Sequence, residues 1–298
     1  MLQSHLGELA ALATAICWSV SSISFESAGK RVGSLAVNYL RLIIGFILIS
    51  IYSYVSRGYL LPTDASVSNW ILLSISGFIG FFLGDLFLFQ SYLEVGSRIS
   101  MLIMASSPPI SAILGYFILH EKLKSASIIG MVITLTGIAM VILSKDSDDK
   151  KIKISHSIKG IIYAFLGSLG QAVGLIFSKI GMGDYSPFAA TQIRIITGFI
   201  SFSLLILIRN KWKDVGLALR DRKAMSGISL GAIFGPFIGV SMSLISLKYT
   251  SAAISSTITS LTPITIIPFS IFVLKDKIKP KEFLGAIVSV IGVVLLFV

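Results

Sequence analysis

The sequence predicts an all-α integral membrane protein in which ten transmembrane helices form two inverted five-helix repeats around a central cavity. Three observations lead to this prediction. The chain is far more apolar than a soluble domain, its apolar segments have the length of membrane spans, and its second half repeats its first half.

Composition indicates that the chain lies in a lipid bilayer. It has 298 residues, of which 54% are hydrophobic and 13% charged, and its mean hydropathy is +0.90; soluble domains carry about 25% charged residues. Ten apolar segments each approach the roughly 20 residues that cross the hydrocarbon core. They are too long for strands and lack strict alternation, so backbone hydrogen bonding in lipid requires helices. The expected helices cover approximately residues 6–26, 34–56, 70–93, 97–118, 126–144, 158–179, 187–208, 225–247, 251–273 and 281–298.

The internal repeat predicts both the domain organisation and a transport function. The matched positions in the two halves include Gly7 and Gly160, Arg41 and Arg194, Pro109 and Pro263, and Gly137 and Gly292. Each half holds five spans, and an odd number inverts the second copy, which is a layout common in secondary transporters. We expect residues 1–145 to form the first repeat, 146–157 a linker and 158–298 the second repeat. The other connections are short, except around 58–69 and 210–223.

The distribution of charge predicts the orientation of the chain. The formal net charge is +11. Apart from the two arginines inside spans, 18 basic residues lie in the connections after helices one, three, five, seven and nine, and 5 lie on the other side. Because Lys and Arg stay cytoplasmic, this bias places both termini outside the cell membrane. The basic loops serve as topology signals and contact anionic lipid, so no nucleic-acid partner is expected.

Two matched arginines are the first candidate site residues. Arg41 in NYLRLIIGF and Arg194 in TQIRIITGF occupy the same position in the two copies, and a charge inside a span costs at least about 2.5–3.5 kcal/mol. Their planar donor forks suit a carboxylate or a phosphate of a substrate. The alternative is structural: each side chain snorkels or bonds carbonyls of its own repeat.

A buried acid completes the set. Asp85, in GFFLGDLFLFQ, is the only acid near the middle of an expected span, where a carboxylate either protonates or finds a cation. Pairing with Arg41, binding of a cationic substrate group and carriage of a coupling proton are all open. Further contacts to the substrate are expected from Trp18, Ser22, Gln90 and Gln171.

Glycine and proline patterns indicate close packing and bent helices. Small residues recur on one face of the third and eighth spans, which allows a neighbouring backbone to approach or clears space for a substrate. Prolines remove helical donors, and Ser and Thr surround them, as in MASSPPIS and SSTITSLTPIT, which favours helices that line a hydrated cavity. The residues concerned are Gly77, Gly80, Gly84, Gly231, Gly235, Gly239, Pro108, Pro109, Pro236, Pro263 and Pro268.

Neither a metal nor a cofactor is expected. Cys17 is the only cysteine, and His5, His120 and His156 are far apart in the sequence, whereas a metal site needs clustered ligands. No GxxxxGK[ST] pattern occurs in the chain, so direct ATP hydrolysis is not expected.

The chain resembles the drug/metabolite transporter superfamily, specifically its ten-helix type with two EamA domains. The resemblance covers nearly the whole chain and rests on NYLRLIIGF with TQIRIITGF, on YLEVGSRIS with LKYTSAAIS, on the proline-bearing fourth and ninth spans, and on LHEKLKSASIIGMVITLTGIAMVIL with LKDKIKPKEFLGAIVSVIGVVLLFV. It implies a central cavity, with helices five and ten peripheral. In similar four-helix multidrug transporters a helix-one carboxylate exchanges cations, but Trp18 stands near that position here. The termini of such proteins are often cytoplasmic, contrary to the charge count.

The repeats and the resemblance together predict a secondary transporter, not an enzyme, that works by alternating access. The expected substrates are small polar metabolites, most of all amino acids or related compounds, moved out of the cell. The alternative within transport is a multidrug or organic-cation exporter that uses Asp85. A membrane enzyme acting on lipid-linked substrates and a non-transporting sensor are the alternatives from other classes. Proton coupling, exchange and facilitated diffusion remain open, and the protein could work as a monomer.

Overall fold

A computed structural model describes residues 5–118, 125–145, 152–154, 156–250, 255, 258–275 and 279–296. His120, most of the expected linker and most of the start of the expected ninth helix lie outside this described part. The first half contains α1 (Leu6–Val32), α2 (Ser34–Arg57), α3 (Val67–Ser76), the π-helix η2 (Gly77–Gly84), α4 (Asp85–Met104), α5 (Ser107–Ile118), α6 (Ser125–Ile142) and β1 (Leu143–Lys145). The second half contains β2 (Ile152–Ile154), α7 (Ile158–Met182), α8 (Pro187–Ile208), α9 (Trp212–Arg220), α10 (Arg222–Ala232), the π-helix η3 (Ile233–Gly239), α11 (Val240–Tyr249), α13 (Thr262–Phe269), the π-helix η4 (Ser270–Leu274) and α14 (Pro280–Leu296).

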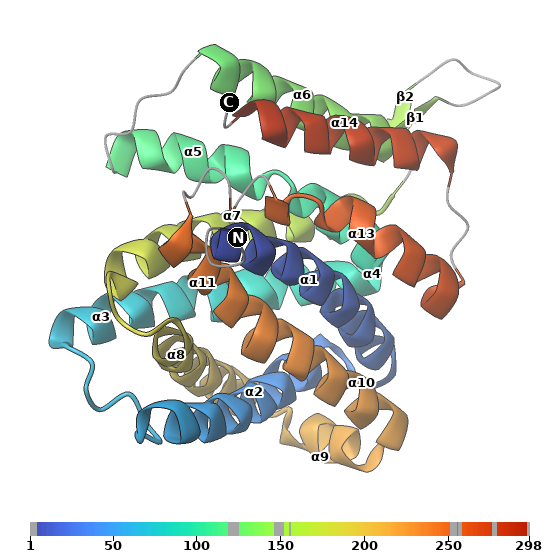
Figure 1. The fold of residues 1–298 in the computed structure, drawn as a ribbon. Coiled ribbons are helices and arrows are strands. Elements are labelled where there is room, and N and C mark those ends of the chain that lie inside the picture. The colour runs from blue at the N-terminus through green and yellow to red at the C-terminus, as the bar shows by residue number, and fades with distance from the viewer. Residues whose placement is uncertain are drawn as a thin grey trace.

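The described chain is almost entirely helical, as Figure 1 shows. Seven helical runs are long and apolar enough to cross a bilayer, among them Val67–Met104 and Arg222–Tyr249. The fourth expected span is divided between the part of α4 after Gly96 and the shorter apolar helix Ser107–Ile118, and the ninth contains the shorter apolar helix Thr262–Leu274. Helix α14 has 17 residues. An all-helical chain with several apolar spans is thereby confirmed, while the count of ten remains a prediction.

Two glycines turn the chain between helices within a single residue. Gly33, between α1 and α2, has φ 82° and ψ 155°. Gly96, inside α4, has φ 81° and ψ 157°. Glycine is almost the only residue that adopts this backbone conformation. The two limbs that meet at Gly96 lie side by side, because Ser91 Oγ donates to Ser100 Oγ at 2.8 Å.

Wider π-helical turns interrupt the third and eighth expected spans near their middle. η2 joins α3 to α4, and η3 joins α10 to α11. Such turns are rare and occur mostly at functional sites. In η3 the ring of Pro236 removes one helical donor, which explains the irregular backbone there. In the other half, Asp85 directly follows η2 and begins α4.

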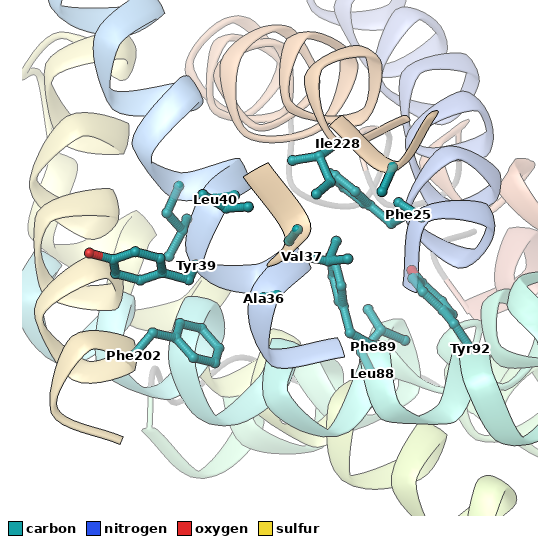
Figure 2. Packing of buried hydrophobic residues seen from close by; sticks show 14 of the residues in the cluster. Phe25, Ala36, Val37, Tyr39, Leu40, Leu88, Phe89, Tyr92, Phe202 and Ile228 are labelled. Carbon is teal, nitrogen blue, oxygen red and sulfur yellow. The ribbon is translucent and has the colours of Figure 1, made fainter. Parts of the chain in front are cut away.

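The largest cluster of buried apolar side chains lies where α1, α2, α4, α8 and α10 meet. Figure 2 shows Phe25 and Phe89 in this cluster, with ring centroids 4.9 Å apart. Val37 and Ile228 are fully buried beside them. Between helices in lipid, van der Waals packing of this kind holds the bundle together, because lipid tails are as apolar as the side chains.

Helices α6 and α14 form a separate pair along one edge of the molecule (Figure 1). They meet through glycines: a Cβ on Gly137 would lie 2.7 Å from the carbonyl oxygen of Gly285, and one on Gly292 would lie 2.7 Å from that of Gly130. Larger residues would separate the two backbones. This arrangement agrees with peripheral fifth and tenth helices.

Two segments differ from the expected loops. Residues 210–223 contain α9, in which Val215 and Ala218 are buried. The ring centroids of Trp212 and Tyr39 lie 5.3 Å apart, with the two rings nearly perpendicular. The apolar residues of α9 cover one face and its charged residues another, which defines a surface helix. Around the linker, β1 pairs with β2 in antiparallel register, with Ser144 opposite Lys153.

Candidate functional site

A cavity of about 160 Å³ lies between the two halves, near the middle of their helices. Its walls come from α1, α2, η2, α4, α5, α7, α8, η3, α11 and α13. Three of its lining residues are charged, namely Arg41, Asp85 and Arg194. Its aromatic lining residues are Trp18, Phe25, Phe81, Phe89 and Tyr92. The cavity therefore combines a small charged group with a largely apolar wall.

Asp85 joins the two repeats. Its Oδ2 accepts a hydrogen bond from Arg41 and forms an ion pair with it. Its Oδ1 accepts from Gln171 Nε2 of α7 at 2.7 Å. The same amide also reaches the carbonyl oxygen of Gly80 in η2, at 3.4 Å. Both carboxylate oxygens are thus bonded to protein, which offsets the cost of burying this acid.

Arg41 is held from several sides. Besides Asp85, its Nε donates to Asn38 Oδ1 at 3.1 Å, and Asn38 Nδ2 donates to the backbone carbonyl of Asp85 at 3.3 Å. Its guanidinium also lies over the Phe89 ring, 4.6 Å from the centroid. A buried ion pair of this kind is strongly destabilised when one partner is removed, since the other charge is left uncompensated.

Arg194 has a different environment. Only 4% of its surface is exposed, and its guanidinium stacks on Phe81 at 4.5 Å from the ring centroid. Its Nε is buried without a hydrogen-bond partner. The Arg194 side chain forms no hydrogen bond and no ion pair with the residues that the structure describes. Its charge interacts with Asp85 only through space.

The structure brings five of the seven predicted site residues to one cavity: Trp18, Arg41, Asp85, Gln171 and Arg194 line it. The other two lie outside its lining. Ser22 Oγ donates to the carbonyl of Ser19 at 3.1 Å, and Gln90 Oε1 accepts from Ser34 Oγ at 2.8 Å. Any role for these two in substrate binding would need a different arrangement of the helices. For all seven, the functional role remains a prediction.

Sequence reasoning missed two residues that position the guanidinium groups. Asn38 precedes Arg41 by three residues, a spacing at which helical side chains meet, and that spacing could have identified it. Phe81 lies against both guanidinium groups, 5.8 Å from Arg41 and 4.5 Å from Arg194. No spacing rule indicated this contact, because it depends on how α8 packs against both η2 and α2.

Ion pairs also tie the helix ends together, away from the cavity. At one end, Arg31 of α1 binds Asp221 at 2.9 Å, and this hydrogen bond holds the pKa of Asp221 below its usual range. At the other, Arg57 binds Asp64, which also accepts from Tyr185 at 2.8 Å. Burial and this hydrogen bond raise the pKa of Tyr185 to about 12. Both pairs fix loops between spans.

The apolar helices form two matched halves, and these enclose a charged cavity at mid-span. This arrangement defines an integral membrane transporter. The chain belongs to the EamA-like transporter family, which it matches over residues 5–143 and again over 158–298. This family falls within the drug/metabolite transporter superfamily that the sequence motifs indicated.

Individual relatives agree with this membership. The uncharacterized transporter YetK of Bacillus subtilis is 22% identical over 296 residues, covering 98% of this chain and 87% of that protein. An uncharacterized transporter of Clostridium kluyveri is 24% identical over 177 residues, and the match spans 59% of this chain and 56% of that relative. A solved structure, described as the crystal structure of a protein, matches 97% of this chain and 95% of its own with a TM-score of 0.63 at 14% identity. At that identity the likeness concerns the fold alone.

Proposed function

We propose that this transporter is a secondary active exporter of small polar metabolites, chiefly amino acids or related compounds, that works by alternating access between its two repeats. One observation carries the proposal: the cavity of about 160 Å³ lies at mid-span, is lined by both halves and contains three charged side chains. A site at the interface of inverted repeats is where rocking of one repeat against the other exposes a substrate first to one side and then to the other.

The charges of the cavity support anionic or zwitterionic substrates over cations. Two guanidinium groups face one carboxylate among the lining residues, and that carboxylate is already paired with Arg41. An arginine fork binds a carboxylate through two parallel hydrogen bonds. An organic cation would meet a net positive site, which disfavours the multidrug alternative.

Transport itself can be tested in proteoliposomes loaded with a mixture of unlabelled amino acids. We expect exchange of an external radiolabelled amino acid, and stabilisation of the purified protein by the same compound in a thermal-shift assay. An imposed pH gradient then tests for proton coupling, with Asp85→Asn as the variant that should remove it. Absence of both exchange and stabilisation for amino acids, sugars, phosphorylated metabolites and organic cations would contradict a transport role and favour a sensor.

The orientation in the cell membrane is a separate part of the proposal. With both termini outside, the connection around Thr63 is external and the one around Gly216 is cytoplasmic. Because Cys17 is the only cysteine, a Cys17→Ala background allows single cysteines to be placed at each site. A membrane-impermeant maleimide on intact cells should then label Thr63→Cys and spare Gly216→Cys. The opposite labelling pattern would reverse the orientation.

A further inference from the structure

We propose that the matched arginines have different roles: Arg194 binds the carboxylate of a small apolar acid, whereas Arg41 neutralises and positions Asp85 within the first repeat. This assignment rests on the proposed transport function and narrows it to one substrate class. It also makes the amino group of an amino acid dispensable for binding.

The two arginines are equally buried but unequally bonded. Arg41 donates to Asp85 and to Asn38, so its charge is compensated by the protein. Arg194 is likewise 4% exposed, yet its Nε is buried without a hydrogen-bond partner, and Arg194 lines the cavity. A buried charge without hydrogen-bond partners is costly. A ligand that supplies acceptor oxygens removes that cost.

The sequence explains how the second repeat loses these acceptors. The position that matches Asn38 is Thr191, whose hydroxyl donates to the carbonyl of Pro187 at 2.8 Å and is thus engaged with its own helix. The position that matches Asp85 is Gly239, which has no side chain. The second copy therefore keeps the arginine and lacks both groups that hold its counterpart. The difference leaves one guanidinium available to a ligand.

The surroundings of Arg194 leave room for such a ligand. Gly80 lies beside the guanidinium, since a Cβ on it would be 3.3 Å from Arg194 Nη2. The Cζ atom of Arg194 lies over the Phe81 ring, 4.5 Å from its centroid, so this ring closes one side of the guanidinium to a ligand. A carboxylate is planar and matches the edge of the guanidinium fork with two oxygens. Methionine and aromatic side chains of the lining, including Met104 and Phe25, are suited to the apolar body of the acid.

The same geometry makes an ammonium group unnecessary. Both oxygens of Asp85, the one acid in the described lining, already accept hydrogen bonds from Arg41 and Gln171. An ammonium group would approach a site where two guanidinium charges exceed one carboxylate. We therefore expect the deaminated acid to bind at least as well as the amino acid with the same carbon skeleton.

The test uses four probes with one apolar body: L-leucine, 4-methylpentanoate, L-leucinamide and 3-methylbutylamine. In a thermal-shift titration of the full-length protein, we expect the two carboxylates to stabilise and the amide and the amine to have no effect. Arg194→Gln should remove the carboxylate response, and Arg194→Lys should weaken it by about tenfold or more, since a single ammonium cannot form the fork. Arg209→Gln, a change of the exposed residue that directly follows the same helix, is the matched control and should respond like the wild type.

If Arg194→Gln does not fold, a second variant still tests the assignment. Thr191→Asn places an acceptor three residues before Arg194, as Asn38 stands before Arg41, and should weaken carboxylate binding while the protein remains folded. Equal stabilisation by the amide or the amine, or an unchanged carboxylate response in Arg194→Lys and Thr191→Asn, would overturn the assignment. So would the absence of any carboxylate response. Counterflow of a substrate that lacks a carboxylate would then keep the transporter and discard only this inference.

Discussion

Two helix crossings occupy matched places in the repeats and are built in different ways. Where α7 crosses η2, glycine meets glycine: a Cβ on Gly170 would lie 2.6 Å from the Cα of Gly84. Where α1 crosses η3, side chains of α1 fill the space: a Cβ on Gly239 would lie 3.1 Å from the Trp18 ring, and one on Gly235 would lie 3.3 Å from the Phe25 ring. One crossing joins backbones, and the other joins a backbone to aromatic rings.

The polar contacts also differ between the α7 crossing and the α1 crossing. At the α7 crossing, Ser76 Oγ donates to the carbonyl of Gly174 at 2.6 Å. Ser76 Oγ also lies 2.7 Å from Ser178 Oγ, where either hydroxyl can donate, and Gln171 donates to Asp85. At the α1 crossing, Thr14 Oγ1 lies 3.4 Å from the carbonyl of Gly239. Residues at matched sequence positions therefore have different roles at the two crossings. We expect substitutions at the α7 crossing to lower stability, and substitutions at the α1 crossing to lower transport.

The largest effect should come from removing the charge that anchors the α7 crossing. Asp85→Leu leaves Arg41 buried without its counter-ion and should lower the free energy of unfolding by about 3–5 kcal/mol. The double variant Asp85→Leu with Arg41→Leu should recover most of this loss, because replacing a whole buried pair is often close to neutral. Reversible unfolding in detergent measures both. A single variant as stable as the wild type would contradict the anchoring role.

Next in size is an added side chain at the glycine contact. Gly170→Val forces Cγ and Cβ atoms against the backbone of η2 and should cost about 1–3 kcal/mol or prevent folding. The matched position on α1 is Cys17, so Cys17→Val is the control, and it should change stability by less. Folded yield by size-exclusion chromatography and the melting temperature are the readouts. Equal losses in the two variants would remove the distinction between the crossings.

Transport should respond most to the aromatic residue of the α1 crossing. Trp18→Gln gives α1 the residue that α7 has at the matched position, and it removes one ring from the cavity wall. We expect the initial rate of counterflow to fall on the order of tenfold, corresponding to about 1.4 kcal/mol. Trp18→Phe should restore most of the rate. A loss of folded protein without a loss in specific rate would place Trp18 with the structural residues instead.

The smallest effect should come from the ion pair that joins α1 to the start of α10. Asp221 has a lowered pKa because of its hydrogen bond with Arg31, so the folded state holds the charged form more strongly than the unfolded state does. This stabilisation is fully present above the unfolded pKa of about 3.9 and is lost as the pH falls through the lower pKa of the folded state. Arg31→Gln should therefore lower the melting temperature slightly at pH 7. The difference from the wild type should shrink as the pH falls from neutral towards the lowered pKa of Asp221, and a difference that stays constant over that range would exclude this cause.

Much of the candidate site could be predicted from sequence because the repeat marks equivalent depths in the membrane. Arg41 and Arg194 lie at matched positions, and Asp85 stands at mid-span, so their meeting in one cavity follows from an inverted pair. Which arginine pairs with the acid could not be predicted. That choice depends on Asn38 and on the crossing of α2 with α4, which no local pattern specifies.

The direction in which each side chain points around its helix could not be predicted from the sequence. Gln90 follows Asp85 by five residues, which is about 140° around a helix, and it therefore lies against Ser34 and not in the cavity. The π turns η2 and η3 could not be read from glycine spacing either, because the same spacing also fits regular packed helices. In α9, an alternation of Trp212, Val215 and Ala218 with charged residues was present but was short enough to be interpreted as a loop.

The single-residue turns at Gly33 and Gly96 have a consequence for how the gene can change. Both keep a backbone conformation that is open almost only to glycine, whereas their counterparts in the second repeat, Ser186 and Thr250, have φ −62° and φ −138°, which any residue adopts. An inserted codon at either glycine would rotate an entire span relative to its partner. We therefore expect related sequences to carry insertions and deletions at these connections in the second repeat and to lack them in the first.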